Sequence, residues 1–129
     1  MTRIRITAGS VTFEAKLAAN PTGAAIAAAL PIEARANTWG DEIYFGIPVE
    51  LEEADDASAE MHVGDLAYWP VGSAFCIFFG PTPASQGIDP RAASPVNWCG
   101  RLSDGGTSHT TALRAVGDGD PIRIERMDA

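Results

Sequence analysis

The sequence of 129 residues predicts a mainly β fold, a barrel of about eight strands with two short helices, in a single domain over residues 1–129. Three observations support this fold class. Short segments alternate between apolar and polar residues, as strands with one buried face do. Glycine and proline, 13 and 9 residues, separate these segments at short intervals. One predicted hairpin is apolar on both faces, which favours a closed barrel over a sandwich.

The chain begins with a predicted β-hairpin and a helix. Residues 2–7 and 11–17 alternate in polarity on either side of a turn that contains Gly9. Asn20 is a suitable helix N-cap, and the alanine-rich run that follows it ends at Pro31. These signals predict a helix of about two or three turns. Its small side chains favour close packing against a sheet.

Two further alternating segments follow the helix. Residues 32–36 alternate, and over residues 43–51 every odd position is apolar. One face of this second strand is therefore expected in the core. The other face, with Glu42 and Tyr44, is expected to meet water or a ligand. Residues 53–61 are predicted to form an acidic, alanine-rich connection.

The hairpin that is apolar on both faces comprises residues 66–69 and 73–79. Residues 80–95 contain four prolines and two glycines, so this segment is expected to be a loop. A loop of this length in a small domain is usually functional or mobile. The remaining predicted elements are a strand over 96–102, a helix over 108–116 capped by Thr107 or Ser108, and a closing strand over 121–127.

Charge limits the classes of partner. The chain has 17 acidic and 9 basic residues, a net charge of −8, and residues 36–90 contain ten acids and no Lys or Arg. A nucleic-acid binder needs a cationic surface, and an anionic membrane would repel this chain, so neither is an expected partner. The acidic middle is expected to be a solvated loop. The alternative is an acidic rim that favours cationic ligands or a divalent ion.

No segment predicts membrane insertion or export. Apolar stretches such as residues 74–79 are far too short to cross a bilayer, and the N-terminus lacks the apolar region of a signal peptide. The two cysteines, Cys76 and Cys99, lie in apolar surroundings and are expected to be reduced core thiols. A cytoplasmic location is therefore expected.

No motif predicts a metal site or a cofactor. The two histidines, His62 and His109, lack the further ligands at the spacing that a zinc site needs, so both are expected at the surface. Burial of Cys76 would raise the pKa of its thiol and make it unreactive. The adjacent acids Asp41 and Glu42 face opposite sides of a strand, so they are not expected to form a carboxylate pair.

Three sequence blocks carry a resemblance to a known family. They are NTWGDEIYF at 37–45, VGDLAYWP at 63–70 and FCIFFGPTP at 75–83. With the strand around Asn97, they resemble a family of small prokaryotic proteins with a cyclophilin-like fold, and the match covers nearly the whole chain. The resemblance implies a closed eight-stranded barrel with a helix at each end. Members of that family are mostly uncharacterised, so it implies an architecture more firmly than an activity.

The second half also resembles the true cyclophilins, which are peptidyl-prolyl isomerases, but it departs from them at the catalytic residues. Residues 72–77 (GSAFCI) stand where cyclophilins carry Gly-Ser-Gln-Phe-Phe-Ile, so Ala74 and Cys76 replace the glutamine and the second phenylalanine. The arginine that cyclophilins aim at the prolyl amide has no counterpart within residues 36–90. The amide barrier is about 18–20 kcal/mol, and lowering it requires a preorganised donor. The departures therefore imply that efficient isomerase activity is lacking.

The leading hypothesis is a protein that binds a peptide or a small ligand in the groove that corresponds to the cyclophilin active site. The residues expected to line this groove are Glu42, Tyr44, Trp69, Pro70, Ala74 and Cys76.

Three other interpretations remain open at this stage. The protein is a weak or atypical peptidyl-prolyl isomerase if Arg91 or Arg101 supplies the missing donor. It is a structural homo-oligomer subunit if an exposed aromatic edge forms the interface. The aromatic residues are structural if Tyr68, Trp69 and Trp98 simply pack against the helices that plug the barrel.

Overall fold

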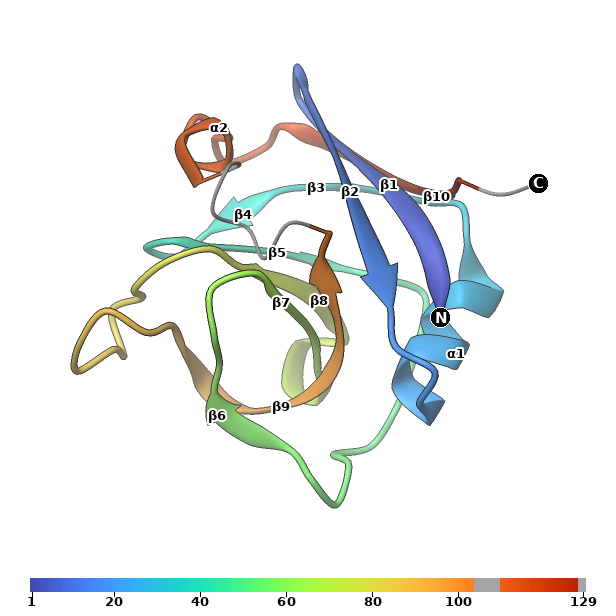
Figure 1. Cartoon of the computed structure of the whole chain (residues 1–129), viewed down its shortest axis with the longest axis horizontal. Helices are drawn as coiled ribbons and strands as arrows, with labels where there is room; N and C mark the ends of the chain where they lie inside the picture. The colour runs from blue at the N-terminus through green and yellow to red at the C-terminus, as the bar shows by residue number, and fades with distance from the viewer. Residues whose placement is uncertain (104–109, 128–129) are drawn as a thin grey trace.

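The fold is mainly β, as the sequence predicts (Figure 1). The computed structural model describes residues 1–103 and 110–127. The strands of this part are β1 (Thr2–Ala8), β2 (Val11–Leu17), β3 (Ile32–Arg35), β4 (Asn37–Thr38), β5 (Glu42–Gly46), β6 (Ser58–Glu60), β7 (Asp65–Trp69), β8 (Ala74–Phe78), β9 (Arg91–Leu102) and β10 (Pro121–Arg126). The helices are α1 (Pro21–Ala29), α2 (Thr110–Arg114) and a 3-10 turn, η1 (Pro70–Gly72).

The strands form one antiparallel sheet in the order β3-β10-β1-β2-β9-β7-β8-β5-β4, with β6 paired to β9 off this path. The two ends of the path, β3 and β4, are consecutive in the chain and separated only by Ala36. Hydrogen bonds between strands do not join these ends, so the expectation of a sheet closed in this way is not confirmed. The reason lies at Ala36, whose N–H donates to Asp120 and whose carbonyl oxygen accepts from Gly119. After Ala36 the chain no longer pairs with β10, and the next strand, β4, pairs with β5.

The strand count differs from the expected eight because two segments pair in ways the sequence pattern does not reveal. The strand expected over 32–36 ends at Arg35, and a separate strand, β4, follows it at residues 37–38. Residues 58–60, expected within an acidic connection, pair with β9 as β6. The strand expected over 43–51 ends at Gly46, although Ile47 and Val49 remain buried.

The segment expected to be a loop over 80–95 is a loop only as far as Pro90, because β9 begins at Arg91. Pro95 lies inside this strand. The pairing of β6 with β9 shifts register there, since Ser58 lies opposite Val96 and Glu60 opposite Arg91. A proline is tolerated at such an irregularity because the regular ladder of hydrogen bonds is already interrupted there and needs no N–H donor from it.

Both expected helices are present. The Asn20 side chain accepts a hydrogen bond from the Gly23 N–H at 2.8 Å, so the predicted N-cap of α1 is confirmed. α2 lies within the predicted range 108–116, and its proposed caps Thr107 and Ser108 lie outside the described residues. In the part of the chain that is described, no helix has the length and apolar character needed to cross a membrane.

The hairpin of β7 and β8 is buried on both faces, as its sequence predicts. One face contributes Leu66, Tyr68, Phe75 and Ile77 to the main core, which also contains side chains of α1, β1, β2 and β10. The opposite face contributes Ala67, Cys76 and Phe78 to a second apolar cluster, together with Met61, Ala92 and Val96. The first half of β9 and its partner β6 therefore cover the outer side of the hairpin.

Two buried polar side chains hold the irregular segment over residues 47–57 against the sheet. The Tyr68 hydroxyl donates to the Val49 carbonyl oxygen at 2.7 Å and accepts from the Leu51 N–H. The Asn97 amide donates to the Glu52 carbonyl oxygen and accepts from the Ala54 N–H at 2.8 Å. The acidic connection is thus fixed through its backbone, and its acidic side chains remain exposed.

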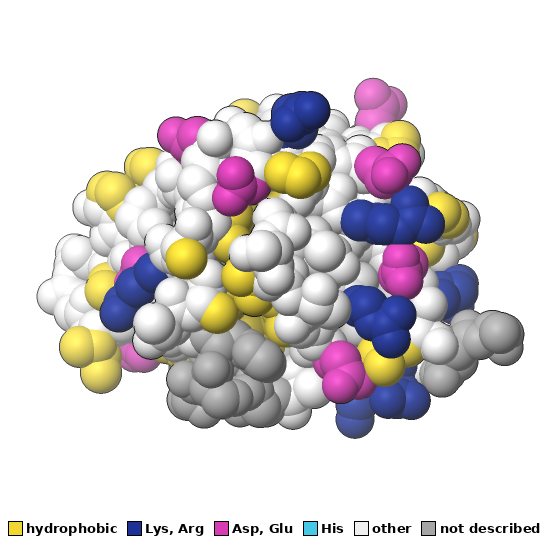
Figure 2. All heavy atoms as spheres, turned by 90° about the horizontal axis from the view of Figure 1, so that it is seen from above, with side chains coloured by type: hydrophobic (Ala, Val, Ile, Leu, Met, Phe, Trp, Pro, Cys, Tyr) yellow, Lys and Arg dark blue, Asp and Glu magenta, His cyan; other side chains and the backbone are white. Residues whose placement is uncertain are grey.

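Basic side chains gather on another part of the surface. On the face shown in Figure 2, most Lys and Arg side chains lie at the right, toward the chain termini. Ion pairs of the basic residues on β1 and β10 include Arg5 with Glu125 at 3.2 Å and Arg123 with Glu33 at 3.3 Å. These basic residues lie on β1 and β10, on the opposite part of the sheet order from β5 and β7.

Candidate ligand pocket

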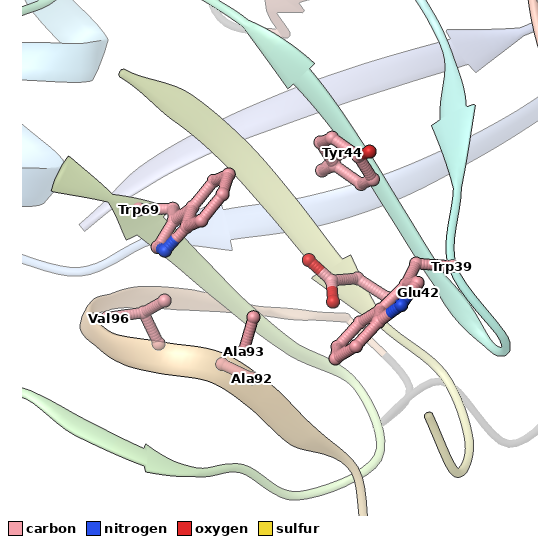
Figure 3. A pocket seen from close by; sticks show the side chains of 7 residues that line it. All are labelled: Trp39, Glu42, Tyr44, Trp69, Ala92, Ala93 and Val96. Carbon is pink, nitrogen blue, oxygen red and sulfur yellow. The ribbon is translucent and has the colours of Figure 1, made fainter. Parts of the chain in front are cut away.

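A pocket of about 210 Å³ lies between the outer face of the sheet and the first half of β9 (Figure 3). We call it the aromatic pocket. Its lining residues are Trp39, Glu42, Tyr44, Trp69, Ala92, Ala93 and Val96. Figure 3 shows Trp39 and Trp69 on either side of the Glu42 carboxyl group, with Ala92, Ala93 and Val96 along β9.

The turn between β4 and β5 places Trp39 beside Glu42. The Trp39 N–H donates to the Glu42 carbonyl oxygen at 2.9 Å, and the Glu42 N–H donates back to the Trp39 carbonyl oxygen at 3.2 Å. Gly40 and Asp41 lie between them, and Gly40 has a φ of +60°, as the first central residue of a type II′ turn requires. Residues paired in this way project on the same face of a hairpin. The turn therefore brings an indole and a carboxyl group together.

The antiparallel register continues this face across the neighbouring strands. Glu42 lies opposite Phe78 of β8, and Tyr44 lies opposite Cys76. Cys76 in turn lies opposite Ala67 of β7. The outer face of β5, β7 and β8 around the pocket is therefore apolar or aromatic, and Glu42 is the acidic residue among the lining side chains.

The Trp69 side chain is held by three neighbours. Its Nε1 donates to Ser94 Oγ of β9 at 2.7 Å, and its ring meets the Tyr44 ring at 81° with centroids 6.3 Å apart. Gly72 of η1 lies against the indole, since a Cβ there would stand 2.8 Å from the Trp69 ring. Because the ring is fixed from these sides, the wall that it forms is preorganised.

Glu42 has an unusual environment for a carboxyl group. Its exposed fraction is 6%. Burial raises the pKa of Glu42 from 4.5 to about 7, and a hydrogen bond with the Cys76 thiol lowers it in part. Among the described residues, no Lys, Arg or His lines the pocket with it. Near neutral pH this carboxyl group can therefore exist in either protonation state.

The Cys76 thiol lies behind the pocket lining and faces two acceptors. One is the Glu42 carboxyl group, and the other is the Ala74 carbonyl oxygen, 4.0 Å from Sγ. We assign the thiol hydrogen bond to Glu42, because 4.0 Å is the outer limit for a sulfur donor and a carboxylate is the stronger acceptor. Burial and the nearby carboxyl group both raise the pKa of Cys76 well above its ordinary value. The thiol is thus a hydrogen-bond donor and a poor nucleophile.

The six residues predicted for the groove are only partly brought together. Glu42, Tyr44 and Trp69 line the aromatic pocket. Cys76 contacts Glu42 from behind, and the buried Ala74 pairs with Trp69 in the ladder between β7 and β8. Pro70 begins η1 and is not among the lining residues.

Sequence reasoning missed four lining residues, Trp39, Ala92, Ala93 and Val96. Trp39 carries a usable signal, because the pattern Trp-Gly-Asp-Glu predicts a two-residue turn that pairs Trp39 with Glu42. Ala92 and Ala93 carry none, since their segment has the composition of a loop. Tyr68 and Trp98 do not line the pocket: Tyr68 is in the main core, and the Trp98 Nε1 donates to Asp65 Oδ1 in a neighbouring hollow.

The sequence matches the family described as Cyclophilin-like over residues 2–125. The chain belongs to the cyclophilin-like family. The chain is similar to a solved structure, the solution structure of a hypothetical protein from Archaeoglobus fulgidus. It is 41% identical, with a TM-score of 0.77 over 97% of this chain and 94% of the other. No curated protein matches the sequence. The predicted family is therefore confirmed.

Neither arginine considered as a donor in this cyclophilin-like protein lines the aromatic pocket. Arg101 donates to Asp65 Oδ1 at 2.7 Å and to the Val63 carbonyl oxygen at 3.1 Å. Arg91 lies 3.8 Å from Glu60 and lines a different hollow beside the loop that precedes β9.

The described residues of the cyclophilin-like chain contain no group of three or more His, Cys, Asp and Glu side chains that could hold a metal ion. The His62 side chain is largely exposed, with Nδ1 3.6 Å from Asp65 Oδ2. His109 lies outside the described residues.

Proposed function

We propose that this cyclophilin-like protein binds a small ligand, free or as one side chain of a peptide, in the aromatic pocket. The observation that supports this most directly is the combination of three aromatic walls with one buried carboxyl group. Apolar pockets with few convergent polar groups are typical ligand sites. The volume of about 210 Å³ favours a compact ligand group over an extended peptide.

The lining suggests how such a ligand is held. Its apolar part packs against Trp39, Tyr44 and Trp69, and the Trp69 ring is held in place before binding by Ser94 and Tyr44. A hydrogen-bond donor on the ligand reaches the Glu42 carboxyl group, which fixes its orientation. Desolvation of the carboxyl group makes a donor in this place more effective than it is in water.

We also propose that the protein lacks efficient prolyl isomerase activity. Stabilising the twisted amide requires a donor aimed at its carbonyl group or nitrogen. The pocket instead presents a carboxyl group, and Arg101 is already bound by Asp65. An exchange assay with a panel of X-Pro peptides should show no acceleration. Acceleration that disappears in Arg91→Ala or Arg101→Ala would contradict this part of the proposal.

The three tryptophans permit a direct test of binding. The indole N–H signals of Trp39 and Trp69 report on the pocket, and that of Trp98 reports on a neighbouring hollow, which shares Val96 with the pocket. NMR titration with a library of small fragments should shift the first two signals and leave the Trp98 signal in place. Tyr44→Ala should weaken binding, whereas Val71→Ala, at an exposed position, should leave it unchanged. Shifts at Trp98 alone, or at no tryptophan, would contradict the proposal.

A further inference from the structure

The chemistry of the pocket walls narrows the class of ligand. Three aromatic side chains, Trp39, Tyr44 and Trp69, surround one acidic side chain, Glu42, and the described lining has no basic residue. We infer that the aromatic pocket selects an organic cation, an ammonium group with small alkyl substituents, and that Glu42 is its counter-ion. This inference rests on the proposed function, because it concerns the same pocket.

The first step is that Glu42 has no cationic partner among residues 1–103 and 110–127, whereas nearby acids have one. Asp41, the preceding residue, binds the Arg114 guanidinium, with Nη2 2.8 Å from Oδ2. Glu60 lies 3.8 Å from Arg91, the residue before the lining residue Ala92. Only burial and the Cys76 thiol act on the pKa of Glu42. A buried carboxylate without a counter-charge is costly, and a cationic ligand would remove that cost.

The second step is the arrangement of the rings. A cation is attracted to the face of an aromatic ring within about 6 Å of its centroid, and tryptophan is the strongest partner. The Tyr44 and Trp69 rings stand at 81° to each other, so they form two adjacent walls. Trp39 closes the opposite side of the carboxyl group in Figure 3. A compact ammonium group between these walls would contact aromatic surface and a carboxylate together.

The third step is the charge of the surrounding chain. Residues 36–90, which include β5 and β7, two of the three strands that line the pocket, hold ten acids and no Lys or Arg. A local excess of one sign of charge raises the local concentration of ligands of the opposite sign. A divalent metal ion is the weaker alternative, since the lining offers it a single carboxyl group and aromatic rings.

The test compares two probes of nearly equal shape. Choline carries a trimethylammonium group, and 3,3-dimethylbutan-1-ol replaces its nitrogen by carbon without the charge. NMR titration at the Trp39 and Trp69 indole signals should give a Kd for choline at least about tenfold lower than that for the alcohol. Equal binding, or tighter binding of the alcohol, would overturn the inference and leave the proposed function standing.

Two further outcomes keep the inference and the proposed function separate. If neither probe binds while neutral aromatic fragments shift Trp39 and Trp69, the cation inference fails and the pocket remains a ligand site. If no probe of any class shifts these signals, both fail.

Substitutions identify the groups responsible. Glu42→Gln keeps the size of the side chain and removes its charge, so it should weaken choline binding at least about tenfold and leave the alcohol nearly unaffected. Glu53→Gln removes the same charge from an exposed acid and should leave both affinities nearly unchanged. Trp39→Leu keeps an apolar wall without a ring face, and it should weaken choline more than the alcohol. The Trp98 indole signal verifies that each variant is folded. An unchanged choline affinity in both Glu42→Gln and Trp39→Leu would overturn the inference.

Discussion

The Glu42 carboxyl group accepts a hydrogen bond from the Cys76 thiol behind the aromatic pocket, and the two side chains come from neighbouring strands. Burial favours the neutral form of both groups, so the pKa of each is raised. The pair joins a group that lines the pocket to a group that does not. Changes at either position should therefore be measurable at the other.

The first prediction concerns stability and pH. The folded protein keeps a proton on Glu42 up to pH about 7, whereas the unfolded chain releases it near 4.5. The contribution of Glu42 to the free energy of unfolding is therefore full below pH 4.5 and falls as pH rises to about 7. The difference between a pKa of 4.5 and a pKa of about 7 corresponds to about 3 kcal/mol in the free energy of unfolding.

Glu42→Gln provides the measurement, because glutamine stays neutral throughout this range. Relative to the original protein, the variant should gain stability between pH 5 and pH 8, by up to about 3 kcal/mol in urea unfolding. Comparing the two proteins cancels the contributions of other titrating groups. Parallel stability profiles would show that the carboxyl group is not desolvated as the structure indicates.

The second prediction concerns Cys76. Its hydrogen bond lowers the pKa of Glu42 against the effect of burial, so Cys76→Ala should raise that pKa above about 7. Titration of the Glu42 side-chain carboxyl carbon by NMR measures this directly. Cys99→Ala is the matched control, because Cys99 is equally buried but belongs to the main core. An equal displacement in both variants would mean that loss of core packing, not the hydrogen bond, is responsible.

The third prediction concerns the turn that pairs Trp39 with Glu42. Gly40 has a φ of +60°, and a Cβ there would stand 2.9 Å from the Thr82 Cα and the Pro83 Cδ. Gly40→Ala should therefore lower the free energy of unfolding by about 1–3 kcal/mol and displace the Trp39 indole signal. Gly87→Ala, where a Cβ meets nothing within 4 Å, should be nearly neutral in the same urea experiment. Equal effects of the two substitutions would argue against a II′ turn at Gly40.

The fourth prediction concerns Asp65, whose side chain is 5% exposed. Its carboxyl oxygens accept hydrogen bonds from Arg101, from the Trp98 indole and from the His62 backbone N–H. Asp65→Ala leaves these donors without their shared acceptor, but Arg101 and Trp98 are partly exposed to water, so the protein should be destabilised by about 1–3 kcal/mol. Glu14→Ala removes an exposed ion pair with Arg3 and should cost less than about 1 kcal/mol. Thermal unfolding of the two variants should therefore separate them clearly.

The predictable part of the fold rests on local patterns. Alternation locates β1, β2 and β10 because each has one face in the main core, continuous apolar runs locate β7 and β8, and Asn20 locates the start of α1. The gap in the sheet at Ala36 could not be predicted. It depends on hydrogen bonds with Gly119 and Asp120, which are distant in sequence.

Three lining residues of the candidate site were predicted from the sequence, Glu42 and Tyr44 on one strand and Trp69 on another. Glu42 and Tyr44 alternate with core residues, so their common face follows from the period of a strand. The wall formed by Ala92, Ala93 and Val96 did not follow from the sequence. The prolines around this segment indicate a loop, and only tertiary pairing with β6 makes it a strand.

The pocket wall formed by β9 contains one residue that the fold depends on and one that it does not. Ala92 is 4% exposed and packs in the second apolar cluster, so a larger side chain there would disturb the sheet. Ala93 lines the same pocket but its side chain is exposed. Relatives of this protein can therefore acquire narrower or differently shaped pockets by substitution at this one position, while the carboxyl group, the rings and the scaffold stay as they are.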